Sequence, residues 1–227
     1  MRIAFVDNFV PAIVSGDQVI DVTEALKPIP RLTPQDLLEG LMGRWDEYRP
    51  KLEAAAKSGK GRPAKGVRFR PPVPRPGKIV CMAGNYMESG TIPAPYDVDA
   101  FLKSPASVIG DGDTVVLPDA PATVFQHESE LGVVIGRTAS KVKAANALSH
   151  VFGYLNFIDV SARGINPNGR NSFCFFLRTG RCHNLFQIGR MPHVRFLVNG
   201  KESHVQVGAI LVFLQPFDFL LRHGRDL

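Results

Sequence analysis

Two glutamates separated by one residue, Glu128 and Glu130, have the types and spacing to do chemistry. They lie in the segment FQHESELGVVIG, whose composition predicts a β-strand. Side chains alternate between the faces of a strand, so both carboxylates would point to one side and His127 to the other. Two like charges there favour a hard divalent cation with oxygen ligands, such as Mg²⁺, Mn²⁺ or Ca²⁺. The alternative is a solvated edge strand with both glutamates in water.

A third carboxylate, Asp159, lies near the end of the apolar segment GYLNFIDVSARG. An acid in such a segment is costly to bury unless it is paired or bound to metal. Arg163 follows four residues later, and its planar guanidinium suits either a substrate carboxylate or a structural pair with an aspartate. We therefore expect Glu128, Glu130 and Asp159 to form a metal site.

The N-terminal residues 1–22 predict short strands, with a turn at 15–17. A helix is expected next, because Thr33 is a good N-cap and Pro34 suits the first helical position. Pro50 is expected to begin a second helix, which ends near Gly59.

The proline-rich residues 61–78 predict an extended connector, and we expect a domain boundary there. The rest of the chain is strand-dominated, and Asn199-Gly200 predicts a hairpin. One helix is expected over about 141–150, behind a Ser140 cap. The expected strands are KIVCMAG, DTVVLP, ELGVVIG, VFGYLNFIDV, VRFLVNGKE and AILVFL.

Composition narrows the class of protein. The 227 residues are 44% hydrophobic, which is ordinary for a globular protein, and we expect a cytoplasmic location without a signal peptide or membrane span. The three cysteines show no zinc spacing and are expected to be reduced. Residues 160–227 hold nine Lys and Arg against three Asp and Glu. These arginines are dispersed and have no nucleic-acid-binding motif beside them, so we expect no nucleic-acid partner.

The order of several segments resembles the fumarylacetoacetate hydrolase family. The matching segments are PRPGKIVCMAGNY (74–86), FLKSPASVIGDGDTVVLP (101–118), HESELGVVIG (127–136), HVFGYLNFIDVSARG (150–164) and VNGKE (198–202).

The resemblance implies an α+β fold, with a small strand-plus-helix domain over 1–70 and a mixed β-roll catalytic domain over 71–227. It also implies a homodimer and Mg²⁺, or Mn²⁺ or Ca²⁺ in its place, held by Glu128, Glu130 and Asp159. Arg163 would contact the substrate. Apart from the resemblance, Lys103 in the segment FLKSP is expected either to hold an anionic substrate or to form an ion pair at the surface.

The sequence departs from the family pattern in three respects. Ser89 and Ile92 stand where many family hydrolases carry a water-activating His and Glu. Glu88 is then the nearest candidate base, or else a solvated loop carboxylate. After Arg163 the pattern fades and a closing strand is missing, so we expect a catalytic domain that is incomplete at its C-terminus.

The expected function is a metal-dependent hydrolase or lyase that breaks a C–C bond of a small oxo- or diketo-acid through a metal-stabilised enolate. The same chemistry would serve a 2-oxo-acid decarboxylase, hydratase or isomerase. The alternative outside catalysis is an inactive family relative.

Overall fold

A computed structural model describes residues 1–83, 100–117 and 124–163, together with the backbone of four short strands further on. Its secondary structure mixes strands with short helices. The strands are β1 Arg2–Val6, β2 Val10–Ser15, β3 Gln18–Asp21, β4 Arg62–Pro63, β5 Phe69–Arg70, β6 Lys78–Met82, β7 Ala100–Lys103, β8 Val124–Ile135, β9 Val151–Arg163, β10 Phe186–Gln187, β11 Leu197–Val198, β12 Lys201–Glu202 and β13 Gly208–Phe213. The helices are α1 Thr23–Leu26, α2 Pro34–Gly43, α3 Trp45–Ser58 and α4 Ala144–Ala147, with 3₁₀ turns η1 Pro105–Ser107 and η2 Leu148–His150.

Helix α2 begins as the sequence predicts. The Thr33 side chain accepts a hydrogen bond from the backbone of Asp36, whose carboxylate accepts one from the Thr33 backbone in return. This capping box satisfies backbone groups that the first turn leaves without helical partners. The pKa of Asp36 is lowered, chiefly by the hydrogen bond with the Thr33 side chain.

The second helix begins earlier than expected. Helix α3 starts at Trp45, and Pro50 lies inside it, so the prediction that Pro50 begins the helix was wrong. The Trp45 ring packs edge-on against Phe152 of β9, with ring centroids 5.2 Å apart. This contact is distant in sequence and packs the first turn of α3 against β9. The helix ends at Ser58 with Gly59 as its C-cap, in agreement with the predicted end near Gly59.

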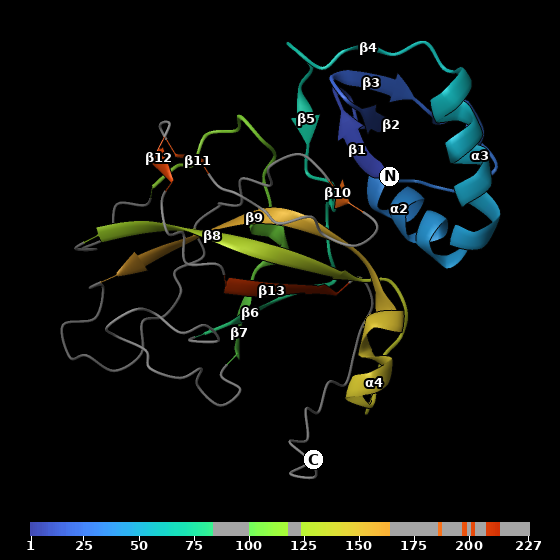
Figure 1. The fold of residues 1–227 in the computed structure, drawn as a ribbon. Coiled ribbons are helices and arrows are strands. Elements are labelled where there is room, and N and C mark those ends of the chain that lie inside the picture. Colours follow the sequence, from blue (N-terminus) through green and yellow to red (C-terminus); the bar gives the residue numbers. More distant parts are fainter. Residues whose placement is uncertain are drawn as a thin grey trace.

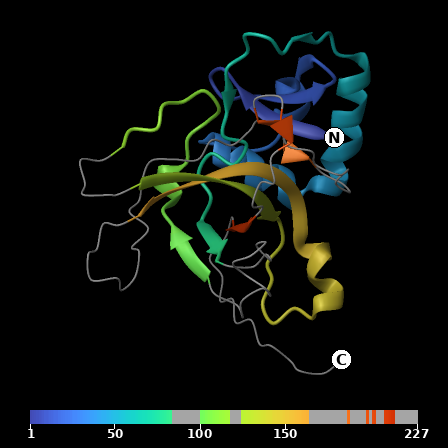
Figure 2. The same ribbon diagram turned by 60° about the vertical axis from the view of Figure 1, so that its left-hand side comes forward.

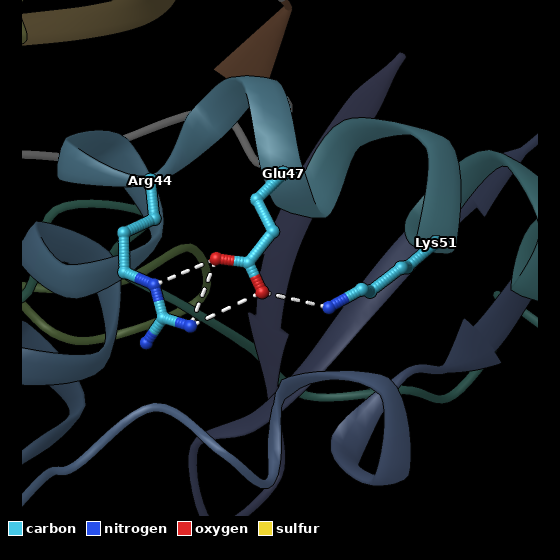
Figure 3. A network of polar contacts seen from close by, with 3 residues as sticks. All are labelled: Arg44, Glu47 and Lys51. Carbon is cyan, nitrogen blue, oxygen red and sulfur yellow. Dashed lines mark hydrogen bonds and ion pairs between the residues drawn. The ribbon is translucent and has the colours of Figure 1, made fainter.

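The first turns of α3 carry a ladder of charged side chains (Figure 3). The Glu47 carboxylate pairs with Arg44 and Lys51, both at 2.8 Å. The cations also approach the Tyr48 ring, with the Arg44 guanidinium carbon 4.9 Å and Lys51 Nζ 4.5 Å from its centroid. The ladder is partly exposed, so its contribution to stability is small, but it covers the buried Tyr48.

One curled sheet connects most of the described strands, in the order β4-β3-β2-β1-β10-β9-β8-β13-β6-β7, with β5 paired to β1. Strand β13 runs parallel to β8, and the other pairs along this order are antiparallel. The long β8–β9 pair crosses the molecule between the N-terminal helices and the β6–β7 pair (Figures 1 and 2).

Two other expected elements, a helix and a strand, are not found as predicted, and both segments carry exposed apolar side chains. The helix expected over 141–150 behind Ser140 is a four-residue α4 followed by η2, and its N-cap is Lys143. Neither element buries a side chain against the described part of the chain, and Leu148 is exposed, so a longer helix would gain no packing from those residues. The strand expected at DTVVLP is also wrong, since residues 113–117 form none and Val116 is exposed. The predicted hairpin is confirmed, because β11 and β12 are antiparallel and Val198 pairs with Lys201.

The main core lies between the N-terminal helices and the long strands. Leu41 of α2, Leu52 of α3, Ile79 of β6, Val134 of β8 and Leu155 of β9 belong to one buried cluster. No helix in the described part of the chain is long and apolar enough to cross a membrane.

Candidate metal centre

The β8–β9 pair brings the three predicted carboxylates to one face. Glu128 lies directly opposite Asp159, and Glu130 lies opposite Phe157. Residues opposite each other in an antiparallel pair point to the same side, so the expected arrangement of Glu128 and Glu130 is found, and Asp159 joins them. His127 lies on the other face, opposite Val160.

The carboxylate face continues directly into the core. Next along β8 on this side is Gly132, where a side chain would meet Leu155 of β9, followed by the fully buried Val134. On β9, Phe157 and Asp159 lie opposite Glu130 and Glu128, and both are buried. The acids therefore lie at the end of an apolar layer, where each needs a positive partner or a proton.

Lys103 supplies one positive partner from another part of the sheet. It ends β7, which β6, β13 and β8 separate from β9 in the strand order. Its ammonium nevertheless forms an ion pair with Asp159 Oδ1 and donates a 2.8 Å hydrogen bond to the Val160 carbonyl. Lys103 reaches β9 because the sheet curls. Lys103 and Asp159 are only 7% and 2% exposed, so removing either partner would leave the other charge uncompensated, at a cost of about 3–5 kcal/mol.

Among the described residues, Glu130 has no positive partner of its own. Its Oε2 atom is buried and makes no hydrogen bond within the described residues. Burial, followed by the charges of Asp159 and Glu128, raises its pKa from the ordinary value of 4.5 to about 8, while Lys103 opposes the shift. Glu130 is therefore protonated at neutral pH when no cation is present.

The donor set fits a hard cation in its chemistry, although its side chains are not gathered around one point. In the part of the chain that the structure describes, no three His, Cys, Asp or Glu side chains lie close enough to hold a metal ion as they stand. Carboxylates without a cation repel one another, and Lys103 already pairs with Asp159. The buried, unpartnered Glu130 oxygen is the feature that a cation would satisfy.

The remaining predicted site residues are placed differently. Lys103 is buried, so it does not form the surface ion pair that was one of its two expected roles, and its contact with a substrate stays a prediction. The backbone of Arg163 ends β9, but its side chain lies outside the described residues. Glu88, Ser89 and Ile92 also lie outside them.

The Lys103–Asp159 pair was missed by sequence reasoning. The available signal was an aspartate in an apolar strand that requires a positive partner. Nothing local identifies the partner, because 56 residues and several strands separate the two positions. The sequence therefore indicated that a partner was needed without indicating which one.

Comparison with known proteins identifies the family. Residues 78–199 match the model of the fumarylacetoacetate (FAA) hydrolase C-terminal domain, which is more than half of the chain. The chain belongs to the fumarylacetoacetate hydrolase family. The matched region includes β8, β9 and all three candidate ligands.

Individual relatives carry different activities in their names. The human mitochondrial oxaloacetate tautomerase FAHD2A is 40% identical over 104 residues, covering 44% of this chain and 33% of that protein. A maleylpyruvate hydrolase from Aquipseudomonas alcaligenes is 32% identical over 168 residues, covering 67% of this chain and 58% of the relative.

Solved structures agree on the fold. Maleylpyruvate hydrolase from Sphingobium sp. SYK-6, in complex with manganese(II) and pyruvate, has a TM-score of 0.71 at 24% identity, covering 93% of this chain and 87% of the other. The chain thus has the fumarylacetoacetate hydrolase type of fold. The sequence match to the human tautomerase, in contrast, spans about a third of that relative's length.

Proposed function

We propose that this chain is a divalent-metal-dependent enzyme, acting on a small oxo- or diketo-acid, in which Glu128, Glu130 and Asp159 hold the cation. Membership of the fumarylacetoacetate hydrolase family supports the reaction class. The observation that carries the site is the buried Glu130 Oε2, without a hydrogen-bond partner in the described region, on the face that Glu128 shares with Asp159. Mg²⁺ and Mn²⁺ suit such a set of carboxylate oxygens.

Each residue would have a separate task. When bound, the cation would supply Lewis-acid stabilisation of negative charge on an oxo-acid oxygen. Glu128 and Asp159 would provide ligands from neighbouring strands, and Glu130 would lose its proton to become a third. Phe157, buried opposite Glu130, would keep water from that side. Arg163, at the end of β9, would receive the substrate carboxylate.

The residues favour a reaction that adds no water. Hydrolysis of a C–C bond needs a positioned base, and Ser89 and Ile92 stand where the family resemblance implies a pair that activates water. Glu88 is the base we propose in their place. We therefore place tautomerisation or decarboxylation of a 2-oxo-acid ahead of hydrolysis. The oxaloacetate tautomerase name of the 40% identical human relative supports this order.

Oxaloacetate is the first substrate to test. The protein would be stripped with EDTA, resupplied with Mn²⁺ or Mg²⁺, and assayed for keto–enol exchange by ultraviolet absorbance and for decarboxylation by pyruvate release. We expect activity only with metal, and loss of it in Glu128→Gln. His127→Gln, on the same strand but the opposite face, is the matched control and should stay active.

Two outcomes would count against the enzyme proposal. Equal rates in EDTA and in Mn²⁺ would remove the metal from the reaction. Tight metal binding without turnover of oxaloacetate or acylpyruvates would instead identify a family relative that binds metal and does not catalyse. The homodimer, the cytoplasmic location and the division into 1–70 and 71–227 stay predictions.

A further inference from the structure

We propose that Lys103 is a positioning residue that holds Asp159 in place for metal binding by fixing β9 from across the curled sheet. The inference rests on the proposed metal site. Lys103 contacts the candidate ligand Asp159, and only the carboxylates would bind the cation.

The first support is that Lys103 contacts two consecutive residues of β9. Its ammonium pairs with the Asp159 carboxylate and donates to the Val160 carbonyl at 2.8 Å. Side chains at these two positions point to opposite faces, but the Val160 acceptor is a backbone carbonyl, so one ammonium with three donors can make both contacts. The two contacts together fix the side chain of Asp159 relative to the backbone of the next residue, Val160.

The second support is the path of the side chain. Strand β7 joins the sheet through β6, and β13 and β8 follow before β9. Lys103 is therefore attached to a strand that does not neighbour β9 in the ladder. The contacts that Lys103 makes with β9 therefore hold this strand from across the curl of the sheet, in addition to the β8–β9 hydrogen bonds.

The third support is burial, which leaves few alternatives for either charge. Lys103 and Asp159 are both buried, so water cannot replace either partner. The opposite strand places Glu128 directly across from Asp159, on the same face. An aspartate held this way stays on the face that it shares with Glu128 and Glu130 while the site awaits its cation. Groups that orient a ligand typically change metal affinity by about 10–100-fold when they are removed.

Calorimetric titration of the EDTA-stripped protein with MnCl₂ tests the inference. We expect Lys103→Met to weaken Mn²⁺ binding by about 10–100-fold. Lys103→Arg keeps a buried cation with donors and should recover part of the affinity. Lys103→Met should also lower the Tm of the metal-free protein, on the order of 10 °C, by leaving Asp159 unpaired.

Two matched variants separate positioning from a general effect. Lys60→Met removes an exposed lysine and should leave Mn²⁺ affinity unchanged. Leu52→Ala in α3 creates a cavity in the core, outside the proposed site. It should lower Tm without changing the affinity of the folded protein for Mn²⁺.

The outcomes are distinct. Should Lys103→Met not fold, Lys103→Gln replaces it, because glutamine keeps a donor for the Val160 carbonyl and lacks the charge. Mn²⁺ affinity that is unchanged in the neutral variant overturns the inference, and so does tighter binding, which would mean that the ammonium only competes with the cation. If the wild-type protein binds no Mn²⁺ at all, the proposed function itself fails.

Discussion

Glu128 of β8 lies directly across the antiparallel ladder from Asp159 of β9. Their side chains share a face with Glu130, whose pKa is raised to about 8 by burial and by these two neighbours, with Lys103 opposing the shift. Such a carboxyl group keeps its proton at neutral pH, and a bound cation would replace that proton. The site should therefore affect how stability depends on pH, and metal binding should release a proton.

The first prediction concerns the pH dependence of the metal-free protein. The folded-state pKa of Glu130 is raised from 4.5 to about 8, so the folded state holds a proton that the unfolded chain releases. Its contribution to stability is full below pH 4.5 and is lost as pH rises toward 8. In EDTA, the free energy of unfolding of wild type should fall relative to Glu130→Gln across this window. Parallel curves from urea unfolding would show that Glu130 does not carry the shifted pKa.

The second prediction concerns the close contact that supports the carboxylate face. A Cβ at Gly132 would lie 2.5 Å from Leu155 Cδ1 and 3.3 Å from the Leu155 carbonyl oxygen. Gly132→Ala should destabilise the fold by about 1–3 kcal/mol through overpacking. Gly43→Ala in α2 is the matched control, because its Cβ meets nothing within 4 Å. Equal stability of the two variants in urea unfolding would contradict the packing described at β8–β9.

The third prediction concerns the start of α2. Thr33→Ala removes the side chain that accepts from the Asp36 backbone, and should lower the free energy of unfolding by about 1 kcal/mol. Thr33→Ser retains the hydroxyl and should restore most of the stability. The measurement is thermal unfolding of both variants, and a neutral Thr33→Ala would mean that the cap is dispensable.

The fourth prediction concerns reaction type. Ser89 and Ile92 stand where a water-activating His and Glu would be expected. Cleavage of acylpyruvates should therefore be slower than in ordinary hydrolases, by about 10²–10⁴-fold for the loss of a general base. Glu88→Gln should abolish what remains, since it keeps the shape and removes the basicity. Turnover at ordinary enzyme rates that is indifferent to Glu88→Gln would place the base elsewhere.

Much of this site followed from local patterns. The alternation of a strand placed Glu128 and Glu130 on one face, and the cost of burying Asp159 indicated that it needed a partner. The Thr33 cap and the Asn199-Gly200 hairpin are likewise determined by a few neighbouring residues. The contact of Trp45 with Phe152 at the start of α3 joins residues far apart in sequence, and the Lys103 contact depends on how the whole sheet curls. Interactions between distant residues leave little trace in local sequence, so these two features could not be predicted.

The measurement closest to the central claim is a titration of the EDTA-stripped protein with Mn²⁺, followed by calorimetry and by the electron paramagnetic resonance signal of free Mn²⁺. We predict saturable binding of one ion per chain, with proton release near neutral pH as Glu130 ionises. Glu128→Ala combined with Glu130→Ala should abolish it. Glu24→Ala combined with Glu53→Ala, which removes two exposed, ion-paired helix glutamates, should not. Equal Mn²⁺ binding by both double variants would contradict the assignment of the metal to the β8–β9 carboxylates.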